Sequence, residues 1–324
     1  TLNPAVDKVY KVENFAVGKV SRAKEVAITA GGKGINVARV CSILGEEVIA
    51  TGFLGGDSGE FIHDAIREDK ILDSFIDIDG ETRTSITISD LLDNTSTEIL
   101  ESGPYISGAE QREFIHNFIK LVEAASVVVL SGSIPRGVDP KFYTRLIDIA
   151  NEKDKKVILD TSGLALKEGI RHIPYMIKPN FSELRAITGK SLTDRVAIEN
   201  EACAIQQEGI ELVCITLDKD GAIAAYDGDI FRVDVPAIDV INTVGCGDAF
   251  VAGCAIGYIR GYDIQKTLRY ATACGMANTQ FLQPGRVEEG LVKEFYREVS
   301  ISKEEFLCDD IVIIDKGRVI AKGT

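Results

Sequence analysis

The sequence lacks the features that mark several large classes of protein. Its seven cysteines are odd in number and never form a C-x-x-C pair, so they indicate neither a disulfide framework nor a zinc site. No apolar run reaches the ~18 to 20 residues that a membrane-spanning helix needs, and no charged-then-apolar leader opens the chain. These absences favour a protein of the reducing cytoplasm.

Basic residues are in the minority. Fifty acidic residues against 36 basic ones give a formal net charge of −14. Nucleic acids and anionic membranes both attract a basic surface, so this charge argues against either as a partner. If the ligands are phosphates, the site must gather a few Lys, Arg and backbone N–H groups within a repulsive field.

Two common nucleotide-binding patterns are also missing. No GxxxxGK[ST] occurs anywhere, and no GxGxxG lies between a strand and a helix near either end of the chain. The first absence argues against a P-loop enzyme. The second argues against a nucleotide-dependent oxidoreductase.

From residue 127 onward, β-branched apolar segments alternate with amphipathic ones. The expected strands are 127–135, 156–163, 175–180 and 211–217, and the expected helices are 139–152, 194–208, 248–260 and 263–279. This rhythm is typical of βαβ units around a buried parallel sheet, so it predicts a doubly wound α/β core. No low-complexity linker divides the chain, and we expect one domain over residues 1–324.

Four other segments alternate apolar and polar residues with a period of two. They are 9–15, 23–29, 84–90 and 97–102. Strands of this kind have one solvated face, so the segments from about 8–29 and 82–103 predict a small sheet outside the core. A small sheet beside a cleft is a candidate lid.

The strongest chemical motif is NTVGCGDAFVAGCAIGY at 242–258, where a glycine-rich turn leads directly into a helix. Gly245 and Gly247 let the backbone N–H groups turn one way, and the helix N-terminus adds a positive dipole end. Asp248 at this position could accept a proton from a hydroxyl group. Taken alone, the motif fits a helix-capping Asp equally well.

A second motif, TAGGKGINVARVCSILG at 29–45, again places glycines before a helix. The Gly31-Gly32 backbone can approach a ligand closely, while Lys33 supplies charge and Asn36 offers a donor and an acceptor. This set suits a sugar phosphate. The alternative is a glycine-rich helix entry with a solvated lysine.

Two further motifs follow core strands. In IKPNFSEL (177–184), Asn180 and Glu183 could point toward a metal-bound phosphate, or they could form a capping box with each other. SGSIPRG (131–137) presents hydroxyl groups and Arg136 to the same sheet edge, or it is an ordinary turn.

In combination the motifs resemble the ribokinase-like PfkB carbohydrate kinases, in order along the chain to about residue 300. The matching segments are TLNPAVD (1–7), AGGKGINVARV (30–40), GFLGGDSG (52–59), SGSIP (131–135), IKPNFSEL (177–184), ITLDKDGA (215–222) and TVGCGDAFVAG (243–253). The resemblance implies a three-layer α/β core with a mainly parallel sheet and a small β-sheet lid. It also implies ATP and Mg²⁺, with a monovalent cation as a further candidate. Because exposed strand edges seek partners, a homodimer formed by edge pairing of the lid strands is a further expectation.

The resemblance also implies roles for individual residues. Asp248 is the expected base, and the amides of Gly245, Cys246 and Gly247 are expected to hold the transferring phosphate. The expected substrate residues are Asp7, Gly32, Lys33, Asn36, Arg83 and Ser133. The expected nucleotide residues are Lys178, Asn180, Glu183, Thr216, Gly221 and Thr243, with Asn180 and Glu183 on Mg²⁺ through water or phosphate.

The TLNP and AGGKGIN segments are similar to the ketohexose-phosphate branch of that family. ETRTSITIS (81–89) is nearer to the kinases of tagatose 6-phosphate than to those of fructose 1-phosphate, with fructose 6-phosphate third. A binding protein that regulates without turnover is the alternative outside the enzymes. The segment 303–324 extends beyond the family's usual end, and 310–324 predicts a hairpin around Lys316-Gly317.

Overall fold

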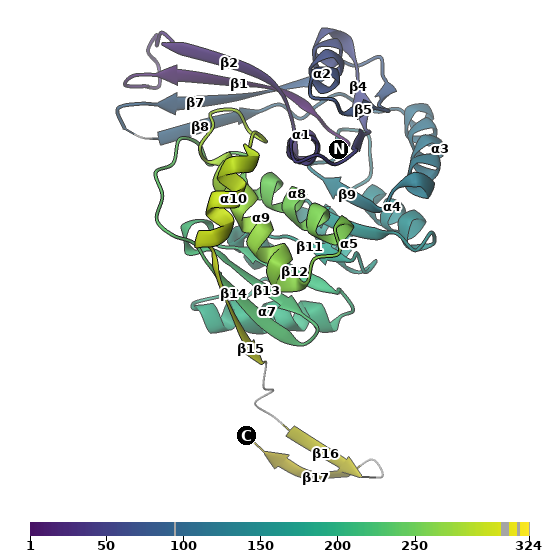
Figure 1. The fold of residues 1–324 in the computed structure, drawn as a ribbon. Helices are drawn as coiled ribbons and strands as arrows, with labels where there is room; N and C mark the ends of the chain where they lie inside the picture. The colour runs from purple at the N-terminus through teal and green to yellow at the C-terminus, as the bar shows by residue number, and fades with distance from the viewer. Residues whose placement is uncertain (94, 306–310, 316–317, 324) are drawn as a thin grey trace.

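The computed structural model describes residues 1–93, 95–305, 311–315 and 318–323. A seven-stranded sheet forms its centre, with helices on both faces (Figure 1). The strands follow the order β15-β14-β13-β12-β11-β10-β9 across this sheet. Their bounds are β9 (Val127–Ser131), β10 (Lys156–Asp160), β11 (Met176–Ile177), β12 (Leu212–Thr216), β13 (Ala222–Tyr226), β14 (Asp229–Asp234) and β15 (Ser300–Glu305).

The central sheet has a parallel half and an antiparallel half. β9 to β12 are parallel, and they are the four core strands that the sequence predicts, although each is shorter. β12 to β15 are joined in antiparallel fashion. A period of apolar residues locates strands but does not give their direction, so the sequence does not predict this second half.

The two faces of the sheet are covered by different helices, because successive side chains of a strand point to opposite sides. On β10, Val157 and Leu159 pack with one set of helices, whereas Ile158 packs with the other. The first set is α3 (Gly108–Ala124), α4 (Phe142–Asn151), α5 (Gly163–Ile170), α6 (Phe181–Thr188) and α7 (Arg195–Gln207). The second is α1 (Lys33–Ile43), α8 (Cys246–Ile259), α9 (Ile264–Asn278) and α10 (Glu289–Glu298). Among the described helices, none is long and apolar enough to cross a membrane.

The predicted small sheet is confirmed as a separate four-stranded sheet (Figure 1). Its order is β2 (Glu25–Gly31), β1 (Ala5–Val12), β7 (Arg83–Asp90) and β8 (Thr95–Leu100), with only the β1–β7 pair parallel. Helix α2 (Gly56–Glu68) packs beside it in a third apolar cluster. The short strands β3 (Ile49–Ala50), β4 (Phe53–Leu54), β5 (Leu72–Asp73) and β6 (Ile76–Asp77) complete this region, and a 3₁₀ turn η1 (Asp218–Asp220) joins β12 to β13.

The segment expected as an extension, 303–324, begins inside the central sheet. β15 contains residues 303–305 and pairs with β14 along its whole length. Beyond it, β16 (Ile311–Asp315) and β17 (Arg318–Gly323) form the expected antiparallel hairpin. Lys316 and Gly317 lie outside the described residues.

Helices α8 and α9 pack closely through a glycine. A Cβ atom added at Gly253 of α8 would lie 2.4 Å from the Cα atom of Ala271 in α9. That contact is with backbone, so a side chain at this position would push the two helices apart.

We therefore expect Gly253→Ala to lower the free energy of unfolding by about 1 to 3 kcal/mol, as overpacking usually does. The matched control is Gly290→Ala in α10, where an added Cβ meets nothing within 4 Å. Because Ala favours a helix over Gly, the control should leave stability unchanged or raise it by up to about 1 kcal/mol. Urea unfolding of both variants measures the difference, and equal midpoints would contradict the close packing.

Candidate active site

Asp248 lies in the first turn of α8, directly after the glycine turn that the sequence singles out. Gly245 caps the helix with a φ of 87°, a conformation that favours glycine. The Asp248 side chain is buried, with 6% exposed. The amide of Cys246 donates to the carbonyl of Thr243 at 3.3 Å, so in this structure it serves the turn itself.

The carboxylate of Asp248 is held by Asn36, whose Nδ2 donates to Oδ2 at 2.8 Å. Burial raises the pKa of Asp248 to about 6. The charge of Lys33, the hydrogen bond from Asn36 and the charge of Lys178 lower this pKa, whereas the negative charge of Asp160 raises it further. A carboxylate with such a pKa is ionised at neutral pH and is a better proton acceptor than an ordinary Asp.

Asp160 lies at the centre of this site, and no sequence motif points to it. It ends β10, is fully buried, and has the Nζ atoms of Lys33 and Lys178 at 3.2 and 3.4 Å. Burial would raise the pKa of Asp160, but the two lysines outweigh it and hold this pKa below its usual value. The available signal was an acidic residue at the carboxyl end of a buried parallel strand, in KVILDTSG.

The same ion cluster keeps Lys33 charged. Burial alone would lower the pKa of Lys33, yet the carboxylates of Asp160 and Asp248 raise it above its usual value. Lys178 also reaches the glycine turn, because a Cβ atom added at Gly247 would lie 3.2 Å from its Nζ atom. The structure thus brings four predicted residues into one site. Lys33 and Lys178 contact Asp160, and Asn36 contacts Asp248.

A second group of predicted residues lies on the small sheet. Asp7 on β1 packs against Gly31, where an added Cβ would lie 1.9 Å from Oδ2, and Gly32 begins α1 with a φ of 96°. Burial raises the pKa of Asp7 to about 6, against the opposing charge of Arg83. The Nε of Arg83 donates to the backbone carbonyl of Asn3 at 3.1 Å.

Asn3 connects the small sheet with the central one. Its Nδ2 donates to the hydroxyl of Ser133, after β9, at 3.0 Å and to the carbonyl of Ser102, after β8, at 3.3 Å. The predicted substrate residue Ser133 is therefore tied to the small sheet. Asn3 itself was not predicted, because nothing in a single Asn indicates a partner 130 positions away.

The residues expected on the nucleotide side form a third group. Asn180 and Glu183 make a reciprocal capping box at the start of α6, with hydrogen bonds of 2.8 and 2.9 Å, so the capping interpretation describes their contacts here. Thr216 lies beside Asn180 across an isolated bridge. Gly221 has a φ of 82°, and a Cβ there would lie 1.9 Å from the carbonyl oxygen of Val233.

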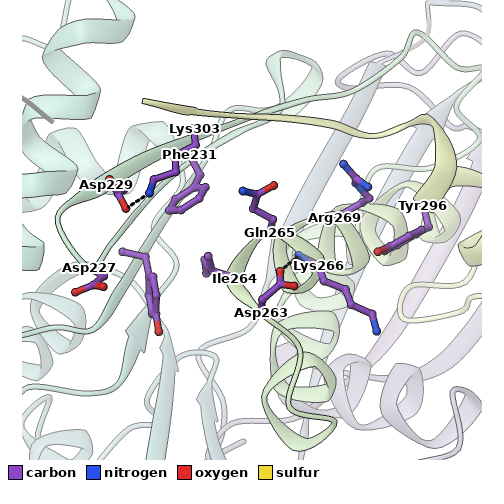
Figure 2. A pocket seen from close by; sticks show the side chains of 11 residues that line it. Asp227, Asp229, Phe231, Asp263, Ile264, Gln265, Lys266, Arg269, Tyr296 and Lys303 are labelled. Carbon is purple, nitrogen blue, oxygen red and sulfur yellow. Dashed lines mark hydrogen bonds and ion pairs between the residues drawn. The ribbon is translucent and has the colours of Figure 1, made fainter. Parts of the chain in front are cut away.

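A hollow of about 560 Å³ lies at the other end of the central sheet (Figure 2). β13 starts beside Thr216 and ends at Tyr226, and Tyr226 lines this hollow together with Lys303 and Asp263. Lys303 forms an ion pair with Asp229 at 2.7 Å on one side of it, between the neighbouring strands β14 and β15. The hollow is therefore separate from the residues around Asp248.

The arrangement around Asp248 combines a buried base, two ammonium groups and a glycine turn at a helix N-terminus, which together suit phosphoryl transfer to a hydroxyl group.

The pfkB carbohydrate kinase family model matches residues 1–286, so the chain belongs to this family. The resemblance drawn from the seven motifs, the α/β fold class and the kinase activity are thereby confirmed.

Several individual proteins are similar to this chain over most of its length. A tagatose-6-phosphate kinase of Staphylococcus epidermidis is 38% identical over 305 residues, which cover 93% of this chain and 97% of the relative. The structure of a possible 1-phosphofructokinase of Thermotoga maritima has a TM-score of 0.86 at 25% identity, covering 94% of this chain and 98% of that one. The phosphofructokinase-2 of Escherichia coli, solved with substrates and products, has a TM-score of 0.85 at 24% identity over 92% and 97% of the two chains, and it supports the fold alone.

Proposed function

We propose that this enzyme transfers the γ-phosphoryl group of ATP to tagatose 6-phosphate and forms the ketohexose 1,6-bisphosphate. The observation that carries the chemistry is the buried carboxylate of Asp248, which Asn36 holds at 2.8 Å beside a glycine turn. The similarity to a tagatose-6-phosphate kinase over 93% of the chain supports the choice of sugar. In the cell, this reaction belongs to the cytoplasm.

In the proposed reaction, the sugar hydroxyl attacks the γ-phosphorus in line with the bond to the β-phosphate oxygen. Asp248 accepts the hydroxyl proton as the new O–P bond forms, and ADP leaves with the electron pair of the bond that breaks. The N–H groups of the turn at Gly245, Cys246 and Gly247 and the end of the α8 dipole stabilise the charge on the transferring group. For the Cys246 amide, this requires release of its bond to Thr243.

The anionic sugar substrate also needs cations to approach ATP. Lys33 stays charged between Asp160 and Asp248, so it can neutralise phosphate oxygens near the base. Arg83 on the small sheet is the proposed partner of the phosphate already on the sugar. Asp7, Gly32 and Ser133 line the sugar side, whereas Lys178, Thr216, Gly221 and Thr243 belong to the nucleotide side.

The residues present fit Mg²⁺ that is bound through ATP. Within the described part of the chain, no group of three or more His, Cys, Asp and Glu side chains could hold a metal ion. Mg²⁺ characteristically keeps several waters and binds one or two carboxylates together with substrate phosphates. Glu183 and Asn180 would hold it through water, and it would supply charge neutralisation of the phosphates. A monovalent cation remains a prediction.

Replacing the proposed base gives the first test. We expect Asp248→Asn to lower kcat by about 10² to 10⁴ or more, because the isosteric amide cannot take the proton. ATP affinity should stay close to that of the unaltered enzyme. Coupled ADP release measures turnover, and the matched control Asp64→Asn, on the exposed surface of α2, should keep full activity. Near-normal turnover of Asp248→Asn would contradict the assignment, and a wild-type enzyme without ADP release would favour the non-catalytic regulator.

The choice of sugar is tested by the ratio of kcat/KM values for tagatose 6-phosphate, fructose 1-phosphate and fructose 6-phosphate. We expect tagatose 6-phosphate to have the highest value. Fructose 1-phosphate is the second candidate, since a Thermotoga maritima protein described as a possible 1-phosphofructokinase shares the fold over 94% of this chain. A kcat/KM value for fructose 1-phosphate that is ten or more times the value for tagatose 6-phosphate would reverse the proposal.

We also propose a homodimer formed through the small sheet. The register places Ile28, Lys8, Ile86 and Ile99 in one row across the four strands, on the face opposite Asp7. Ile28 and Ile99 are 51% and 54% exposed, which is unusual for large apolar side chains gathered on one face.

The dimer is tested with Ile28→Lys combined with Ile99→Lys. Sedimentation velocity should show a dimer for the unaltered enzyme and a monomer for the double variant, because two buried lysines per partner would not be paired. Leu164→Lys, on α5 and equally exposed at 54%, is the matched control and should remain dimeric. A monomeric wild-type enzyme would contradict the proposal.

A further inference from the structure

Arg39 is a buried arginine that none of the roles above uses. It lies on α1, three residues after Asn36 and therefore on the same side of the helix, and it is 2% exposed. Its Nε donates to the carboxylate of Asp69 at 2.6 Å. A buried ion pair of this kind seldom adds stability over apolar packing, so the remaining N–H groups of Arg39 are of more interest.

One of these groups fixes the amide of Asn36. The Nη1 of Arg39 donates to Oδ1 of Asn36 at 3.3 Å, and the Nδ2 of Asn36 donates to Asp248 at 2.8 Å. An arginine can only donate hydrogen bonds, so the atom of Asn36 that faces it must be the oxygen. The other end of the amide, which faces Asp248, must then be the NH₂ group. A flipped amide would direct an oxygen at the carboxylate, and the two would repel each other.

The remaining N–H groups of Arg39 donate to backbone carbonyl groups near Asn36. Nη2 donates to the carbonyl of Ala30 at 2.7 Å, just before Gly31, and Nη1 also donates to the carbonyl of Pro284 at 3.1 Å. Gly285, next in the chain, donates its N–H to Oδ1 of Asn278 at 2.7 Å.

Asn278 in turn donates from Nδ2 to the carbonyl of Val244, in the glycine turn, at 2.9 Å. Gly285 also packs on Asn36 itself, because a Cβ atom added there would lie 2.7 Å from the Asn36 Cα atom. Arg39 thus anchors Asn36 directly and the segment that supports the turn indirectly.

From these contacts we infer that Arg39 is a positioning residue for the phosphoryl transfer: it sets the orientation of the Asn36 amide, and through it the orientation and charge of Asp248. The inference rests on the proposed role of Asp248 as the base. Among the described residues, Arg39 hydrogen-bonds to Asn36, to Asp69 and to two backbone carbonyls, and its charge also acts on Asp7.

The pH dependence of the reaction provides a specific measure of this role. Asp248 is faced by Lys33 and Asn36 from α1, by Asp160 from the end of β10, and by Lys178 after β11. The hydrogen bond from Asn36 favours the ionised form of Asp248 and so lowers its pKa. Loss of that bond should raise this pKa, and the acidic limb of the rate profile should move to higher pH.

The test is Arg39→Lys, which keeps the positive charge but loses the fork that reaches Asn36. We expect the acidic limb of kcat/KM for the sugar phosphate to move up by about 0.5 to 1 pH unit, the size expected from one hydrogen bond to a charged group. We also expect kcat on the plateau to fall about tenfold, with KM for ATP unchanged. The sugar phosphate and Asp7 titrate in the same range. Arg39→Lys keeps the positive charge that acts on Asp7, so both contributions are the same in the two enzymes and cancel in the comparison.

Asn36→Ala provides the second arm of the experiment. It should move the limb at least as far as Arg39→Lys does, and the double variant should move it no further than Asn36→Ala alone, because both changes act on one hydrogen bond. Additive shifts would overturn the inference.

Arg260→Lys is the matched control for stability. Arg260 links α8 with the end of α1, through Glu46 at 2.7 Å and the carbonyl of Leu44 at 2.7 Å, at the ends of both helices that lie away from Asp248. It should lower the thermal midpoint and leave the limb in place. If Arg39→Lys does the same, Arg39 has only a structural role.

Failure of the base assignment and failure of the inference about Arg39 give different results. Full turnover of Asp248→Asn would refute the base assignment itself, whereas an inactive Asp248→Asn together with an unmoved limb in Arg39→Lys would refute the inference alone. If Arg39→Lys does not fold, the double variant Arg39→Met with Asp69→Asn removes both charges of the buried pair. It should show the same upward movement of the limb, and this movement should disappear in an Asn36→Ala background, whereas a movement caused by the lost charge near Asp7 would persist and overturn the inference.

Discussion

The site depends on one constraint, which is that a buried carboxylate must remain ionised. Burial raises the pKa of Asp248, and the nearby charge of Asp160 raises it further. Two lysines and one oriented amide oppose these effects. The resulting pKa of about 6 leaves Asp248 ionised at neutral pH yet basic enough to take a proton.

The same arrangement explains how a chain with a net charge of −14 can bind phosphates. Asp160 is fully buried and attracts Lys33 and Lys178 to one point, so two positive charges are fixed at the carboxyl end of the parallel strands. The carboxylates of Asp160 and Asp248 keep Lys33 charged, although burial alone would lower its pKa. Repulsion of a bound phosphate by more distant exposed carboxylates is screened over about 10 Å at moderate ionic strength.

The features that the sequence predicts are those determined locally. Glycines with positive φ, such as Gly32 and Gly245, appear directly before helices, and the period of apolar residues locates the core strands and the small sheet. The features that it misses depend on distant partners. Lys33 and Asp160 are 127 positions apart, and Arg39 and Pro284 are 245 apart, so no local pattern could have paired them. The direction of β13 to β15 is missed for the same reason, since strand pairing is a long-range property.

The separation of Asn36 and Asp248 by 212 positions also affects the order in which the protein can mature. During synthesis, the small sheet and α1 leave the ribosome long before α8 does. Contacts between such distant segments form late in folding because their loops must close first. The hydrogen bonds of Arg39 are complete only when Pro284 is in place, and the central sheet is complete only when β15 (Ser300–Glu305) has paired. A nascent chain therefore cannot hold the Asn36–Asp248 contact, or the contact of Arg39 with Pro284, until α8 and the segment at Pro284 have joined the fold.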